Sequence, residues 1–131
     1  MPNPASGIID RRSSRPVAQT IDRLESQVTA RGMTVFARID FSGDAQRAGL
    51  SMRAMQLLIF GNPRAGTPLL VAAPRIGLDL PLKALAWEDE DGSVWLSCKS
   101  PEYLEASYQL PRELKANIEG IRALVEAAVE P

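Results

Sequence analysis

The segment 60–101 constrains the fold of this chain most strongly, because glycines, prolines and paired acidic residues interrupt its short apolar runs. Each glycine or proline restricts the backbone to a small set of turn conformations, so the path of the chain is closely prescribed. No cluster of nucleophile, base or metal-ligand side chains is visible in the segment. It therefore predicts a scaffold more clearly than it predicts a reaction.

Two runs in this segment, 84–89 and 93–99, are predicted to form a β-hairpin. A three-residue loop joins them, and Gly92 suits the left-handed position of that loop. The resulting register places Trp87 directly opposite Trp95. Two opposed indole rings are expected to anchor the hairpin on one face.

Two amphipathic helices are predicted on either side of the strand-rich region. The first begins near Pro16 and ends at Gly32, and the second begins near Pro111 and tolerates Gly120. In each helix, apolar residues follow at steps of four, three and four, which places them on one face. The two stripes are Val17, Ile21, Leu24 and Val28, and Leu114, Ile118, Ile121 and Val125.

Three further strands are predicted before the hairpin. The second of them alternates apolar and polar residues, and the third is a continuous apolar run that suits a central strand. The strands are expected at 8–13, 33–41 and 55–60, with short helical insertions at 44–50, at 67–73 and from Pro101.

The order of these elements predicts an α+β fold of the β-α-β(4)-α type. In this arrangement an antiparallel or mixed sheet carries the long helices on one face, and the short helices are insertions. The length of 131 residues fits one domain, at 8–131, after a flexible N-terminus at 1–7.

Composition excludes several classes of function. The chain has no histidine and one cysteine, Cys98, which excludes histidine-based triads, multi-thiolate zinc sites and intrachain disulfides. A formal net charge of -1 argues against a nucleic-acid partner. No apolar run approaches the roughly 20 residues that cross a membrane. We therefore expect a cytoplasmic protein that has no cofactor and does not act at a membrane.

The order of several short motifs closely resembles the domain of unknown function 302 family. The motifs are Gly61-Asn62-Pro63, Gly66-Thr67-Pro68-Leu69 and Asp79-Leu80-Pro81-Leu82-Lys83. The resemblance implies a fold similar to the TATA-binding-protein-like β-α-β(4)-α class and a dimeric protein. It implies no established activity.

Members of this family often carry a histidine directly after the aspartate that corresponds to Asp40, and an Arg-His pair near the end of the domain. Phe41 and Ser107-Tyr108 stand at these positions here. The resemblance therefore implies that an activity based on those histidines is absent from this chain.

The stretch rich in glycine and proline after the third strand is a candidate anion site. Gly66 and Thr67 could present backbone N–H groups near a helix start, and Arg64 adds positive charge. Pro63 and Pro68 each remove a donor, so a purely structural turn is the competing interpretation.

A second candidate pair is Asp79 and Lys83, which lie four residues apart around a Leu-Pro-Leu stretch. The functional interpretation is an ion pair or a desolvated lysine at the edge of a pocket. The structural interpretation is a clasp that holds the local conformation, or an ordinary surface pair.

Two other groups are interpreted as structural. Asp89, Glu90 and Asp91 could recruit a divalent cation, but they are too few for a calcium loop and suit a solvated hairpin tip. Strand alternation points Cys98 and Lys99 to opposite faces, so the thiol lacks its nearest activating partner and is expected to be inert.

Three functions stay open at this point. The leading hypothesis is a homodimeric binding or interaction module without intrinsic catalytic activity. The competing hypothesis is an enzyme or sensor for a small anionic ligand, in a pocket formed by Arg38, Arg64, Lys83 and nearby carboxylates, with Gly66 and Thr67 as further binding residues. The third is regulatory binding to a partner protein through an apolar patch.

Overall fold

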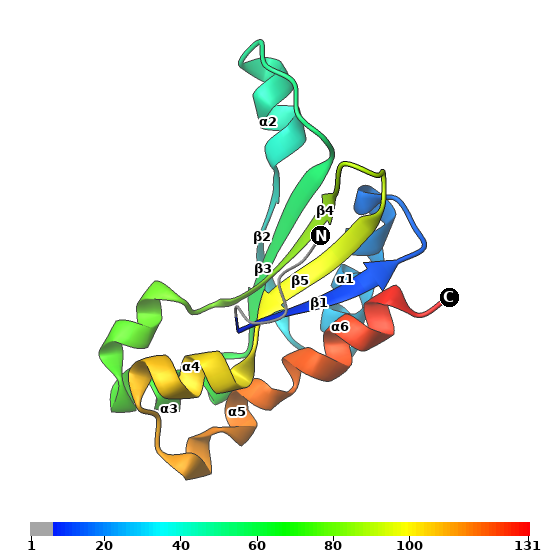
Figure 1. Ribbon diagram of the computed structural model, residues 1–131. Coiled ribbons are helices and arrows are strands. Elements are labelled where there is room, and N and C mark those ends of the chain that lie inside the picture. Colours follow the sequence, from blue (N-terminus) through cyan, green and yellow to red (C-terminus); the bar gives the residue numbers. More distant parts are fainter. Residues whose placement is uncertain (1–6) are drawn as a thin grey trace.

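The computed structural model describes residues 7–131, which contain one five-stranded antiparallel sheet (Figure 1). The strand order is β1-β5-β4-β3-β2, so β4 is the central strand. The strands are β1 (Ile8–Ser13), β2 (Thr34–Asp40), β3 (Met55–Gly61), β4 (Leu82–Glu88) and β5 (Val94–Lys99). The α+β prediction is confirmed, and the sheet is antiparallel throughout. Residues 1–6, which hold most of the predicted flexible N-terminus, lie outside the described part.

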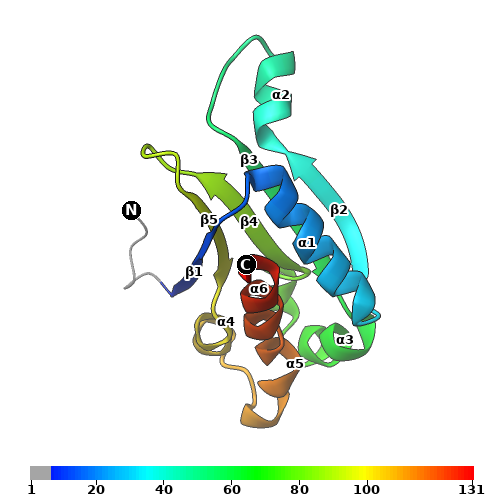
Figure 2. The same cartoon turned by 90° about the vertical axis from the view of Figure 1, so that its right-hand side faces the viewer.

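Two helices cover one face of the sheet. These are α1 (Val17–Ala30) and α6 (Ile121–Val129), which pack side by side in front of the strands in Figure 2. The apolar stripe predicted for α1 is buried along its whole length. The sheet contributes its alternate residues to the same core, among them Leu58, Phe60, Ala84, Ala86 and Leu96.

The central hairpin has the predicted register. Trp87 lies opposite Trp95 in the pairing of β4 with β5. Gly92 has a φ of +81°, the left-handed conformation that the loop requires. The Asp89 carboxylate accepts hydrogen bonds from the N–H groups of Asp91 and Ser93, at 2.9 and 3.0 Å. Asp89 therefore closes the loop, and it is buried instead of standing at a solvated tip.

Helix α3 (Pro63–Ala72) begins earlier than the sequence predicts. The Asn62 side chain accepts a hydrogen bond from the Arg64 N–H at 3.0 Å, and a proline at the first helical position needs no N–H partner. Residues 61–63, which begin the stretch that could have been a purely structural turn, are therefore the end of β3 followed directly by a helix. Helices η1 (Pro74–Leu78) and α4 (Pro101–Tyr108) complete this end of the molecule.

The C-terminal helix is not the single helix that the apolar spacing predicts. It is divided into η2 (Arg112–Leu114), α5 (Ala116–Glu119) and α6, with a break at Gly120. Glycine in a helix interior costs about 1 kcal/mol relative to alanine, which favours a break at this position. The break lets Ile118 join a second small core with residues of α3, η1 and α4, while α6 packs on the sheet.

Helix α2 (Phe41–Arg47) also begins earlier than predicted, because the Asp40 carboxylate accepts a hydrogen bond from the Gly43 N–H at 2.9 Å. The helix projects beyond the end of the sheet in Figures 1 and 2, and it contains no buried residue. Together with the chain up to β3 it forms an arm, which we define as residues 41–54.

Candidate functional site on the open face of the sheet

The face of the sheet opposite α1 and α6 carries no covering helix within residues 7–131. We call it the open face. Strand alternation places every second residue there, and cross-strand partners share the face. Strands β2 to β5 contribute half-buried apolar side chains to it, and β1 adds the exposed Ile8. The half-buried residues are Ile39, Met55, Leu57, Ile59, Leu85, Trp87 and Trp95.

The polar groups at the centre of the open face are bonded to one another. The Trp87 indole N–H donates to the Ser97 hydroxyl at 2.8 Å, and that hydroxyl donates to the Asp10 carboxylate. The Trp95 indole N–H donates to Asp89 at 2.9 Å. Both indole rings are thereby fixed in orientation, and their N–H groups need no further partner.

A charged cluster lies at one end of the open face. The Asp79 carboxylate accepts hydrogen bonds from the Lys99 ammonium and the Tyr108 hydroxyl. The Lys83 ammonium instead donates to the backbone carbonyls of Asp79 and Pro81, at 3.1 Å each. The structure therefore pairs the Asp79 carboxylate with a residue 20 positions away, and Lys83 closes the backbone of the turn.

The pKa values of this cluster follow from its geometry. Partial burial alone would raise the pKa of Asp79, but the hydrogen bonds from Lys99 and Tyr108 outweigh it and hold the pKa below its ordinary value. Partial burial lowers the pKa of Lys83, an effect that the Asp79 carboxylate opposes and the Lys99 ammonium reinforces. The cluster thus combines two cations with one carboxylate.

A pocket of about 360 Å³ lies against this cluster. Its walls are mainly apolar, and its polar groups are those of the cluster and Ser97. Its apolar walls include Ile8, Leu57, Leu78 and Leu85, and its ammonium groups belong to Lys83 and Lys99.

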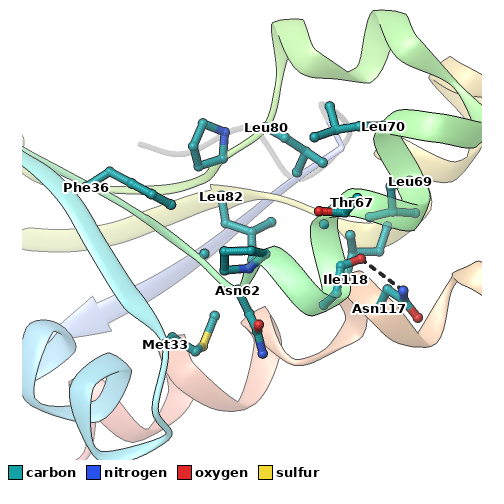
Figure 3. Close-up of a pocket in the computed structure, with 15 residues that line it drawn as sticks. Met33, Phe36, Asn62, Thr67, Leu69, Leu70, Leu80, Leu82, Asn117 and Ile118 are labelled. Carbon is teal, nitrogen blue, oxygen red and sulfur yellow. Dashed lines mark hydrogen bonds between the residues drawn. The ribbon is translucent and has the colours of Figure 1, made fainter.

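A second pocket, of about 250 Å³, lies between α3, α5 and the ends of β2 and β4 (Figure 3). We call it the α3 pocket. Its lining is almost entirely apolar. The Asn117 side chain, at its edge, donates to the Ala65 carbonyl at 2.9 Å and so ties α5 to α3.

The residues predicted to form one anion pocket lie at three separate places. The Arg38 guanidinium is on the helix side of β2, where it donates to Asp22 and the Ala18 carbonyl of α1 at 2.7 and 3.1 Å. Lys83 lies on the opposite side of the sheet, on the open face. A pocket that combines Arg38 with Lys83 is therefore not formed, because strand alternation separates them.

The other three predicted residues belong to α3. Arg64 is exposed, whereas Gly66 and Thr67 line the α3 pocket. The Gly66 N–H donates to the Asn62 carbonyl at 2.8 Å, so this donor is occupied within the helix start. The predicted anion cradle at this turn lacks that donor.

Cys98 faces the helices and is buried, on the opposite side of β5 from Lys99. Burial raises the pKa of its thiol to about 12, an effect that the more distant Arg11 only partly opposes. The predicted inert thiol agrees with this geometry. Within residues 7–131 no group of three or more acidic or cysteine side chains could hold a metal ion.

Sequence reasoning missed Lys99, Tyr108 and Ser97 as members of the site. Lys99 was considered only as a neighbour of Cys98, although the hairpin register extended by two residues brings it across from Lys83. Tyr108 had one signal, because it stands at a position where relatives carry a histidine, and its hydroxyl reaches the charged cluster.

Comparison with known proteins places this geometry in a family. The family model described as "Domain of unknown function DUF302" matches residues 9–128. The chain belongs to the DUF302 family. A crystal structure of an uncharacterized conserved DUF302 protein from Bacillus stearothermophilus has the same fold, with a TM-score of 0.78, 23% identity, and coverage of 95% of this chain and 97% of that one.

The DUF302 domain is also similar to part of longer curated proteins. It is 44% identical over 105 residues to a protein named fluoride-specific ion channel FluC 1 from Brucella suis biovar 1, which covers 80% of this chain and 41% of that protein. A protein named FluC 2 from Brucella melitensis matches at the same identity over 39% of its length. The chain thus spans about two fifths of these relatives. Across residues 7–131 no helix has both the length and the apolar character to cross a bilayer.

Proposed function

We propose that this DUF302 domain is a homodimeric binding module in which two copies pack their open faces together. The observation that carries the proposal is a face of half-buried leucine, isoleucine and tryptophan side chains, spread over four strands, without a covering helix in residues 7–131. Contiguous apolar patches of this kind are rare on monomeric proteins and usually mark an interface. A second copy is the occupant that a self-complementary, two-fold interface supplies.

The hydrogen bonding of the open face supports its burial in a dimer. The Trp87, Ser97 and Asp10 side chains already bond to one another, as do Trp95 and Asp89. A partner that covers them leaves none of these donors without an acceptor, so burial avoids the cost of an unsatisfied polar group. The apolar area of the face then contributes favourably to association.

The arm supports the same proposal. The arm carries three exposed apolar residues, because α2 and its following loop contact little of their own chain. The exposed fractions of Phe41, Leu50 and Met52 are 37%, 68% and 43%. An apolar arm that extends past the sheet gains its stabilising contacts from a neighbouring molecule. We propose that each arm reaches over the edge of the partner. A cytoplasmic location, which the single buried thiol favours, belongs to the same proposal.

Sedimentation equilibrium from submicromolar to high micromolar concentration tests the dimer. We expect a mass near twice 14.3 kDa at micromolar concentration. A monomer over the whole range would refute the proposal.

A second candidate function is the binding of a small organic anion beside Lys83. The specific observation is that the Lys83 ammonium, at the wall of a mainly apolar pocket, bonds to two carbonyls and forms no ion pair with any carboxylate of residues 7–131. An apolar body with one negative charge fits such a lining. The fluoride-channel names of the relatives add fluoride as a specific anion to test.

Titration with benzoate and with sodium fluoride, followed by calorimetry and amide NMR, tests this second candidate. We expect benzoate to shift the resonances of Lys83, Leu85 and Lys99, and Lys83→Met to weaken its binding about tenfold. Lys115→Met removes a lysine elsewhere on the surface and serves as the matched control. Equal binding to both variants, or no binding to the wild type, would exclude an anion site at Lys83.

A further inference from the structure

We propose that the α3 pocket binds a small, uncharged and mainly apolar molecule of one or two rings, with one polar group directed at Thr67. Of the described residues that line it, Leu82 alone also lines the pocket beside the charged cluster, so the site does not depend on either proposed function. Its residues come from β2, β3, α3, the turn before β4, and α5 (Figure 3).

The lining of the α3 pocket selects against charge. None of the residues that line it is ionisable, although 24% of the chain is charged. Its principal walls are Phe36, Leu69, Leu70, Leu80, Leu82 and Ile118. A charged group placed against these walls would give up part of its hydration without gaining an opposite charge, which is unfavourable. A neutral apolar molecule avoids that cost.

The start of α3 does not change this selectivity. A helix N-terminus can attract anions through free N–H groups. Here the first N–H groups after the cap are engaged, since those of Arg64, Ala65 and Gly66 all donate to oxygens of Asn62, at 3.0, 3.0 and 2.8 Å. The helix start therefore offers the pocket no free N–H from these residues.

The volume of the α3 pocket sets the size of the ligand. A dry cavity of about 150 Å³ with apolar walls is enough to take up benzene. The volume of about 250 Å³ found here accommodates one or two rings. A lipid chain of typical length would extend beyond it.

Thr67 supplies the polar contact. Its hydroxyl points into the pocket in Figure 3, and Thr67 is exposed, so water can bond to the hydroxyl until a ligand replaces it. One N–H group of the nearby Asn117 amide already donates to the Ala65 carbonyl. A ligand with one donor or acceptor can thus bond to Thr67 while the rest of the molecule contacts leucine and phenylalanine side chains.

Indole and toluene are suitable probes, because they are similar in character but only indole carries an N–H. Amide NMR should show shifts at Gly66, Thr67 and Leu69 with both probes, and none at these residues with benzoate. Thr67→Val keeps the shape and removes the hydroxyl. We expect it to weaken indole about 3- to 10-fold and to leave toluene unchanged, and Thr67→Ser to restore indole binding. Thr29→Val, on an exposed part of α1, is the matched control.

A blocking variant tests the location of the site. A side chain at Gly61 would begin 3.5 Å from Phe36 and 3.7 Å from Pro81, at ordinary contact distance and inside the pocket. We expect Gly61→Val to weaken both probes at least tenfold. If it does not fold, Leu70→Trp fills the pocket from its exposed rim.

Two results would overturn the inference. One is probe binding that persists in both blocking variants, or that shifts only residues of the open face. The other is the appearance of the same shifts on raising the protein concentration without a probe, which would assign the pocket to a side chain of a second copy. Indole binding that survives in a monomeric open-face variant would separate this site from the dimer.

Discussion

Replacement of Leu85 by lysine is expected to separate the two copies of the proposed dimer without unfolding either. Leu85 lies on the central strand and on the open face, between Leu57 on one side and Ser97 on the other. Its neighbours along the strand, Ala84 and Ala86, are the residues that face the core. A change at this position therefore alters the open face and leaves the packing under α1 and α6 intact.

The expected size of the effect follows from the half-buried state of Leu85 in one copy. Covering its remaining surface contributes about 1 kcal/mol, and a two-fold interface contains the residue twice, so Leu85→Ala costs about 2 kcal/mol. This corresponds to about 30-fold in the dimer dissociation constant. Lysine adds the desolvation of two ammonium groups, which raises the loss to at least about 1,000-fold.

Sedimentation equilibrium on both variants, with thermal unfolding measured in parallel, gives the two quantities needed. The matched control is Val71→Lys, because Val71 is a 76% exposed apolar residue on α3, outside the open face. We expect the control to dimerise like the wild type. If Leu85→Lys dimerises with wild-type affinity and keeps its fold, the open face is not the interface and the reasoning is refuted.

Three other predictions concern stability and reactivity. Because the folded-state pKa of Asp79 is lowered, its ion pair with Lys99 stabilises the fold above the unfolded-state pKa of about 3.9, and this contribution is lost as pH falls through the folded value. In Asp79→Asn the free energy of unfolding, measured with urea at a series of pH values, should therefore fall less steeply toward acid pH than in the wild type. An unchanged pH dependence would contradict this role of Asp79. Cys98, with a pKa raised to about 12, should react with iodoacetamide at pH 8 only after denaturation, and rapid labelling of the native protein would contradict its burial. The free energy of unfolding should also fall as pH rises from about 9 toward 12, because the thiol ionises first in the unfolded chain. Asp89→Ala removes three hydrogen bonds of the hairpin loop, one of them from Trp95. It should lower the melting temperature and change the tryptophan fluorescence. A wild-type fluorescence spectrum would show that other contacts hold the Trp95 indole.

The hairpin could be predicted in detail because its determinants are local. The strand alternation, the loop length and Gly92 together allow one register, and that register alone sets Trp87 against Trp95. The long α1 stripe is equally local, since a 3.6-residue period needs no information from the rest of the chain. Both features were correct for this reason.

The errors arose where one side chain shifts a boundary. Asp40 and Asn62 cap α2 and α3 and move both helix starts toward the N-terminus, although each is a standard capping residue visible in the sequence. Gly120 was accepted inside a helix, where the second small core instead favours a break. The capping signals were available, but the competing packing around Ile118 was not.

The candidate site depended on contacts that sequence separation hides. Asp79 and Lys83 looked like a pair because they are close in the chain. In the structure the Asp79 carboxylate accepts hydrogen bonds from Lys99 and Tyr108 instead. These two residues come near Asp79 through the pairing of β5 in the sheet and the position of α4. Arg38 and Lys83 both looked available to one ligand, but they pair with neighbouring residues of β3, Leu58 and Ile59, whose side chains point to opposite faces of the sheet. As long as the register between the strands is unknown, charge and composition cannot show which face of the sheet a residue occupies.

A single NMR measurement on mixed copies tests whether the open faces meet. In a sample of isotope-labelled and unlabelled protein, isotope-filtered spectra report only contacts between different copies. We expect contacts between copies from the side chains of Leu57, Leu85 and Trp87, and none from Val71. A dimer whose contacts between copies all lie outside the open face would contradict the proposed interface.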